Sequence, residues 1–150
     1  MRFWVAAFLG TAAGCACEPL PCENGLDVTI LFGALDEGRW LLDIRAEGDG
    51  ASAQFDVIDG APEPTIDSPI ALDQDEDGVI ATATFHPDAN PAAVVLTVTD
   101  PDGLSVFAFS DAELTAPSRP ISEACGGLCR SGAVTIDLRE PLRKKNDLGA

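Results

Sequence analysis

The sequence has few basic and few aromatic residues, a single histidine and no tyrosine. Its 150 residues include 9 Lys and Arg against 25 Asp and Glu, a formal net charge of −16. Because nucleic-acid binding depends on clustered Lys and Arg that face phosphates, this balance argues against a nucleic-acid partner. His86 alone could serve a hydrolase, and no Gly-x-Ser-x-Gly pattern accompanies it. We therefore expect a protein that is not an enzyme, with His86 exposed at a strand end.

The apolar residues are numerous but small. They make up 46% of the chain, whereas aromatic residues make up 6%, and 22 residues are Ala. This content excludes a chain that is disordered throughout, since such chains are poor in hydrophobic residues. One domain of this length can bury a core, and we expect covalent links to stabilise a core so rich in Ala.

The N-terminal segment has the pattern of an export signal. Arg2 precedes an apolar run over residues 3–14, which is too short to span a bilayer. Cys15 follows the small residues Ala12, Ala13 and Gly14, and here the sequence resembles a bacterial lipoprotein signal. The resemblance implies a signal peptide over residues 1–14, cleavage before Cys15, a diacylglycerol on its sulfur and an acyl chain on its amine. Several acyl chains would make membrane attachment effectively permanent.

The expected location of the protein depends on how its N-terminus is processed. Since Ala16 and not Asp follows Cys15, similarity to sorted lipoproteins implies the outer membrane, facing the periplasm or the surface. Ordinary signal peptidase cleavage after Ala16, with Gly14 and Ala16 as the small residues, would instead release a soluble secreted β-domain.

The remaining cysteines form two pairs at opposite ends of the chain. Without Cys15 they number four, as expected in an oxidising compartment: Cys17, Cys22, Cys125 and Cys129. Four cysteines permit three connectivities, and we favour bridges between the two pairs. Closing a loop of about 100 residues in this way would stabilise the fold by about 4 to 5 kcal/mol in the chain-entropy model, and a second bridge would add less. A zinc site is the alternative, although neither spacing is Cys-x2-Cys.

Between these pairs, apolar and polar residues alternate with period two in short runs bounded by Gly, Pro and Asp, which predicts about seven β-strands. The runs lie within residues 26–32, 40–47, 54–57, 79–85, 94–99, 104–108 and 134–139. Short turns at residues 36–38, 48–50 and 100–103 predict antiparallel neighbours. We expect an all-β immunoglobulin-like antiparallel sandwich over residues 26–139, with a small open barrel as the alternative. Residues 15–25 would then be a Cys-rich linker.

Two long connections interrupt the strands. Residues 59–78 are rich in Pro and could contain an edge strand over Thr65–Leu72, and residues 110–132 contain Cys125 and Cys129. Such loops are where a sandwich commonly carries its function.

An acidic turn is the one candidate for a metal site. Asp73, Asp75 and Asp77 precede Gly78 in the Asp-x-Asp-x-Asp-Gly pattern that begins a calcium loop. Thr84 stands where an EF-hand requires a bidentate Glu, which excludes that motif. A calcium site of a β-protein type, completed by Glu76 or a remote acid and with no other cofactor, and a solvated acidic turn are the two interpretations.

Charge is distributed unevenly. Residues 43–77 hold 11 acids and one base, whereas Arg139, Arg143, Lys144 and Lys145 lie near the C-terminus. We expect residues 140–150 to be a disordered basic tail, which could contact cell-wall polymer or anionic headgroups.

Several of these features together resemble a group of uncharacterised small lipoproteins of proteobacteria. They are the N-terminal cysteines, the Gly-x-Trp-Leu-Leu-Asp-Ile segment at Gly38–Ile44, and Cys-Gly-Gly-Leu-Cys-Arg before the last predicted strand. The resemblance implies a disulfide-linked β-domain and no known activity. We expect a monomeric, lipid-anchored envelope protein that acts as a structural or protein-interaction module; a calcium-dependent or carbohydrate-binding module is the alternative.

Overall fold

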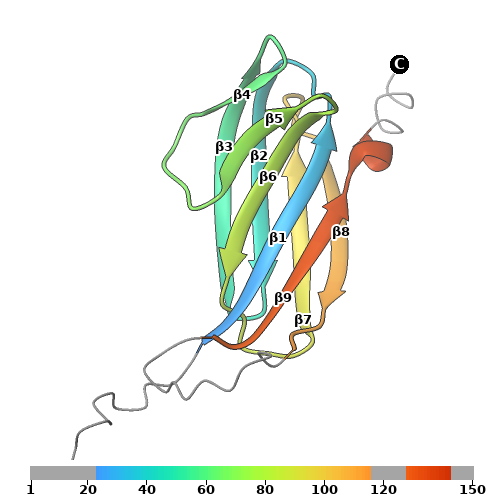
Figure 1. Ribbon diagram of the computed structural model, residues 1–150. Helices are drawn as coiled ribbons and strands as arrows, with labels where there is room; N and C mark the ends of the chain where they lie inside the picture. Colours follow the sequence, from blue (N-terminus) through green and yellow to red (C-terminus); the bar gives the residue numbers. More distant parts are fainter. Residues whose placement is uncertain (1–22, 116–127, 143–150) are drawn as a thin grey trace, which may run out of the picture.

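The computed structural model describes residues 23–115 and 128–142, which form two β-sheets packed face to face (Figure 1). The prediction of an all-β sandwich is confirmed. The strands are β1 (Glu23–Gly33), β2 (Gly38–Ala46), β3 (Asp49–Ile58), β4 (Ala61–Pro64), β5 (Ala71–Asp75), β6 (Gly78–Phe85), β7 (Ala92–Thr99), β8 (Ser105–Ala112) and β9 (Leu128–Asp137).

The strand order differs in one respect from the antiparallel sandwich that we expected. One sheet has the order β5-β6-β1-β9 and the other β4-β3-β2-β7-β8. All neighbours are antiparallel except β1 and β9, which pair in parallel along their length. A parallel pair requires a long connection between its strands, and here almost the whole domain lies between them.

Two of the nine strands arise from the proline-rich connection. β4 pairs with the end of β3, and β5 pairs with β6. The predicted edge strand over Thr65–Leu72 is wrong, because residues 65–70 lie between the two strands. Proline lacks the N–H that a central strand needs, so Pro62 and Pro64 fit only the sheet edge that β4 occupies.

The core lies between the sheets and follows the predicted alternation. Leu26, Val28, Ile30 and Phe32 of β1 are at most 1% exposed, and they face residues from the other sheet. The ring of Phe32 meets that of Phe55 edge to face at a centroid distance of 6.2 Å. The few large side chains are therefore concentrated where the sheets meet.

Trp40 belongs to this core, as predicted. Its side chain is buried, and its indole N–H donates to the Asp36 carbonyl over 2.9 Å. The bond satisfies the polar atom of a buried ring.

Four connections lie at one end of the sandwich, opposite the end where β1 begins (Figure 1). They join β1 to β2, β3 to β4, β5 to β6 and β7 to β8, and they are rich in acidic residues. Strands β1 and β2 belong to different sheets, so the prediction that this short turn joins paired neighbours is wrong. The chain instead crosses between the sheets through Gly33, whose φ of +74° suits glycine.

The domain extends further toward the C-terminus than the expected boundary at residue 139. Residues 139–142 form one helical turn, and Leu142 is 5% exposed within the core. Because β9 runs parallel to β1, this turn lies at the end of the sandwich remote from Glu23. The expected tail therefore begins after Leu142, and residues 143–150 lie outside the described part of the chain.

Candidate interaction surface

Strand β8 exposes two phenylalanine side chains. Phe107 and Phe109 are 71% and 65% exposed, the highest values among the large apolar residues that the structure describes. Between and beside them, Val106 and Ala108 turn inward and pack against the core. Alternation along the strand thus places both rings on the outer face of the five-stranded sheet.

The same outer face continues across the neighbouring strands. Phe109 lies opposite Val95 of β7, and Phe107 lies opposite Thr97. Leu41 of β2 lies opposite Thr99 in the next row. Val95 and Leu41 are 40% and 43% exposed. We call Leu41, Val95, Phe107 and Phe109 the apolar patch.

Four charged side chains beside the patch form two ion pairs, whereas Asp111, two residues after Phe109 on the same face, lies outside them. Arg45 contacts Asp43 with its Nε 3.1 Å from Oδ2, and Ser52 donates to the other oxygen of Asp43 over 2.7 Å. Toward the loop end, Arg39 forms a bidentate pair with Asp56 at 2.8 and 3.1 Å. Hydrogen bonding from Arg39 lowers the pKa of Asp56. The two pairs offset four of the charges on this face, and Asp111 adds one negative charge beside Phe109.

Two hollows indent this face. One of about 290 Å³ is bounded by Leu41, Gln54, Thr97 and Thr99, with Ile66 from the β4–β5 connection on its far side. The other, of about 700 Å³, is an open depression beside the β2–β3 hairpin, and Val95 and Arg45 line it. The patch is thus an uneven surface rather than a flat one, which suits contact with another macromolecule.

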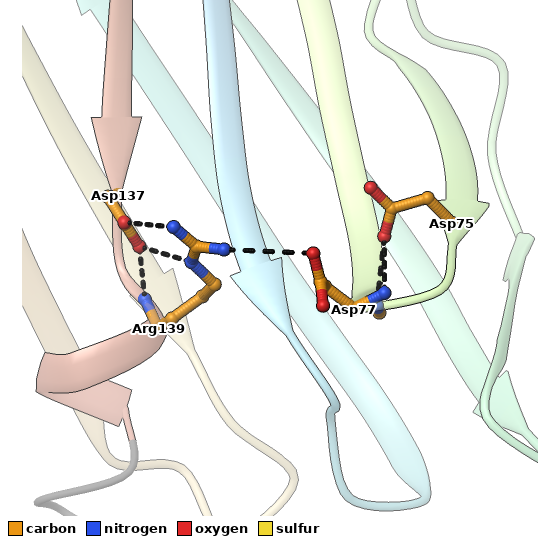
Figure 2. A network of polar contacts seen from close by, with 5 residues as sticks. Asp75, Asp77, Asp137 and Arg139 are labelled. Atoms are coloured by element: carbon orange, nitrogen blue, oxygen red, sulfur yellow. Dashed lines mark hydrogen bonds and ion pairs between the residues drawn. The ribbon is translucent and has the colours of Figure 1, made fainter.

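The three residues of the predicted calcium site form hydrogen bonds or an ion pair within the fold. The Asp75 carboxylate accepts the backbone N–H groups of Asp77 and Gly78 at 2.8 and 3.0 Å. The Oδ2 atom of Asp77 lies 3.9 Å from Nη1 of Arg139, across the end of β1 (Figure 2). Asp73 accepts the N–H of Gln74 within β5. Within residues 23–115 and 128–142, no three acidic, His or Cys side chains are grouped as metal ligands.

Arg139 also holds the end of β9. Its backbone N–H, Nε and Nη2 donate to the Asp137 carboxylate at 2.9, 2.9 and 2.6 Å (Figure 2). These bonds lower the pKa of Asp137 to about 2. The sequence analysis assigned Arg139 to a basic region near the tail, whereas the structure assigns it to the link between β9 and the β5–β6 turn.

His86 has structural contacts at the end of β6. Its Nδ1 lies 2.9 Å from the Asn24 carbonyl oxygen, and its backbone N–H donates to Asp49 over 2.8 Å. The Glu23 carboxylate lies 3.6 Å from the ring. The histidine is exposed at a strand end, as predicted.

Four of the five cysteines, Cys15, Cys17, Cys22 and Cys125, lie outside the described residues, and so does the expected signal peptide. Only the backbone of Cys129 is described, at the start of β9. In the parallel pair, Glu23 lies opposite Leu128. The residue after Cys22 and the residue before Cys129 are therefore neighbours across two strands.

Phe107 and Phe109 were not among the residues predicted from the sequence. The alternation was assigned there to the smaller residues Leu104, Val106 and Ala108 as the apolar set of this strand. The signal in the sequence was that the alternate positions, Phe107 and Phe109, hold larger apolar side chains than the assigned core positions. A strand with one solvent-exposed face normally carries polar residues on that face.

Comparisons with known proteins leave the family open. No family model matches the chain, and neither the curated proteins nor the solved structures contain a significant match. No helix in the described part of the chain is long and apolar enough to cross a membrane.

Proposed function

We propose that this chain is a non-catalytic, lipid-anchored interaction module of the bacterial cell envelope, which binds a protein through the apolar patch. The observation that carries the proposal is the exposure of Phe107 and Phe109 on one face of the sheet, beside two ion pairs. Exposed apolar patches mark interaction sites, and aromatic residues are common anchors of protein interfaces.

The proposed anchor fits the placement of the acidic residues. Attachment through Cys15 would put the membrane on the side of Glu23, where β1 begins. The acidic connections, such as those at Asp36–Glu37 and Asp75–Asp77, lie at the other end. Anionic headgroups repel acidic side chains, so this orientation keeps these connections away from the membrane surface.

The anchor is tested by intact mass spectrometry of the exported protein from membranes. We expect a mature chain that begins at Cys15 and carries the mass of a diacylglycerol and an acyl chain. An unmodified chain that begins at Cys17 would contradict the anchor and favour the soluble secreted form.

Binding is tested by site-specific photo-crosslinking in intact cells. Benzoylphenylalanine in place of Phe107 should give a defined protein adduct, because the side chain at this position is exposed on the proposed contact face. The matched control carries the same probe in place of Thr82, an exposed residue of β6 in the other sheet. Equal adducts at both positions, or none at position 107, would contradict binding through the patch.

A further inference from the structure

Strand β8 differs from the other three edge strands in having little that prevents another strand from pairing with it. β9, the edge of the four-stranded sheet, contains the charged Arg130 and Asp137 and Gly132. β4 is four residues long and contains Pro62 and Pro64, and β5 is five residues long and contains Asp73 and Asp75. Short length, proline and charge are the usual means by which proteins protect a sheet edge. The eight residues of β8 contain no proline, glycine or base, and Asp111 is their single charge.

The free side of β8 is available over its central residues. Among the described residues, its hydrogen-bonded strand neighbour is β7 alone. β8 lies at the margin of the five-stranded sheet in Figure 1. Beyond the strand, Thr115 bridges Ser131 of β9, and no other described strand pairs with β8 around Ala108.

The sequence of β8 is complementary to itself in the antiparallel direction. If Ala108 of one copy faces Ala108 of a second, Phe107 faces Phe109 of the second copy and Phe109 faces its Phe107. Both aromatic pairs then lie on the outer face, where the rings already stand exposed. Cross-strand aromatic pairs stabilise antiparallel sheets.

The charges allow this arrangement. In the same register Asp111 faces Ser105, so no like charges stand directly opposite each other. Two strands away on the outer face, Arg45 and Asp43 form an ion pair within each copy. A foreign strand would need its own matching aromatic residues, whereas a second copy supplies them in this register.

We propose that β8 is a homodimerisation edge, in which two copies pair antiparallel about Ala108 and join their five-stranded sheets into one. The inference rests on the proposed interaction function and names its partner as a second copy of this chain. It replaces the monomer expected from the sequence. A closed two-fold pair also covers the free β8 edge of each copy, which limits further association through this strand.

The first test is sedimentation velocity over a range of concentrations and salt. The full chain carries Cys15→Ser, so that acyl chains cannot bring copies together. We expect a dimer that becomes more populated as salt screens the net negative charge. A monomer at every concentration and salt would overturn the proposal.

Charge variants test the register. In a Phe107→Lys/Phe109→Lys chain, each Lys faces a Lys of the other copy, and the dimer should be lost. In a Phe107→Lys/Phe109→Glu chain, each Lys faces a Glu, and association should be about tenfold stronger than in the double Lys chain, since two opposed pairs change sign. A Leu104→Lys/Ile58→Lys control, with both sites exposed and off β8, should dimerise like the parent. Equal association of the two β8 variants would overturn the pairing about Ala108.

Photo-crosslinking identifies the occupant of the edge. Benzoylphenylalanine at position 107 of the purified chain should join the peptide around residue 109 of a second copy. A crosslink to residues 116–127 of the same chain would overturn the dimer. If the purified chain stays monomeric but position 107 gives a defined adduct with another protein in cells, the homodimer fails and the interaction function stands; if neither occurs, both fail.

Discussion

A side chain on Gly78 would overlap the carbonyl group of Gly33, which belongs to the neighbouring strand β1. Gly78 also has a φ of +132°, a conformation that other residues rarely adopt. The glycine of the calcium-like pattern is therefore explained by the close approach of two strands.

Substitution of Gly78 should consequently be severe. We expect Gly78→Ala to lower the free energy of unfolding by about 2 to 5 kcal/mol, from backbone strain and a steric clash together. Gly103→Ala is the matched control, because its φ is +85° but a side chain there meets no atom within 4 Å. It should cost about 1 to 2 kcal/mol. Urea unfolding measures both, and equal effects would contradict the clash.

Asp75 distinguishes a turn cap from a calcium ligand. Asp75→Asn keeps the side-chain oxygen that accepts from Asp77 and Gly78, whereas Asp75→Ala removes it. We expect Asp75→Ala to destabilise the domain by about 1 kcal/mol and Asp75→Asn by less.

Calcium titration completes this comparison. Because Asp75 is hydrogen-bonded within the turn and Asp77 lies near Arg139, we expect millimolar calcium to produce no heat in calorimetry and no rise in melting temperature. A rise in melting temperature that both Asp75→Ala and Asp75→Asn abolish would contradict the role of Asp75 as a turn cap and favour the calcium-binding module.

How much of this fold the sequence predicts depends on burial. The alternation identified β1, β2 and β6 because every second residue there enters the core. β4 and β5 were missed as strands because they are largely exposed edges without buried alternate residues. The parallel pairing of β1 with β9 has no local signature, since the partners lie about a hundred residues apart in the chain.

The apolar patch was harder to predict than the core. Val106 and Ala108 marked the inward face of β8, and that assignment alone says nothing about what the outward face binds. The patch depends on residues of β2, β7 and β8 that only the sheet brings together. The ion pair of Asp43 with Arg45, beside the patch, also becomes visible only in the structure.

The Asp137–Arg139 pair predicts a pH dependence of stability. Asp137 has a pKa of about 2 in the folded protein, below its ordinary value near 4. An acid whose pKa is lower in the folded than in the unfolded state stabilises the fold at pH values above the unfolded-state pKa. This contribution disappears as the pH falls from about 4 to about 2. Asp137→Asn should therefore be less stable than the parent above pH 4, and the difference should shrink toward pH 2. Urea unfolding across this range measures it, and a difference independent of pH would contradict the pair.

The neighbourhood of Glu23 and Leu128 predicts the disulfide pattern. Their pairing brings together, at the strand spacing of about 4.8 Å, the two segments of the chain that border the N-terminal and the C-terminal cysteines. We therefore expect non-reducing peptide mapping to join the N-terminal cysteine pair to the C-terminal pair. Reduction should lower the melting temperature markedly, because long loops are opened. Bridges confined to Cys17–Cys22 and Cys125–Cys129 would contradict this pattern.

Phe107 and Phe109 should matter little for the stability of an isolated copy. Most of each side chain is in water, so a substitution that keeps β-propensity loses little packing. We expect Phe107→Thr/Phe109→Thr to change the free energy of unfolding by about 0.5 kcal/mol per site or less, measured where the chain is monomeric. Phe55→Ala, at a fully buried position of the same sheet, should cost about 3 to 5 kcal/mol. If the β8 substitutions cost as much as the core substitution, the rings are covered within one copy, and they cannot serve as a surface for a partner.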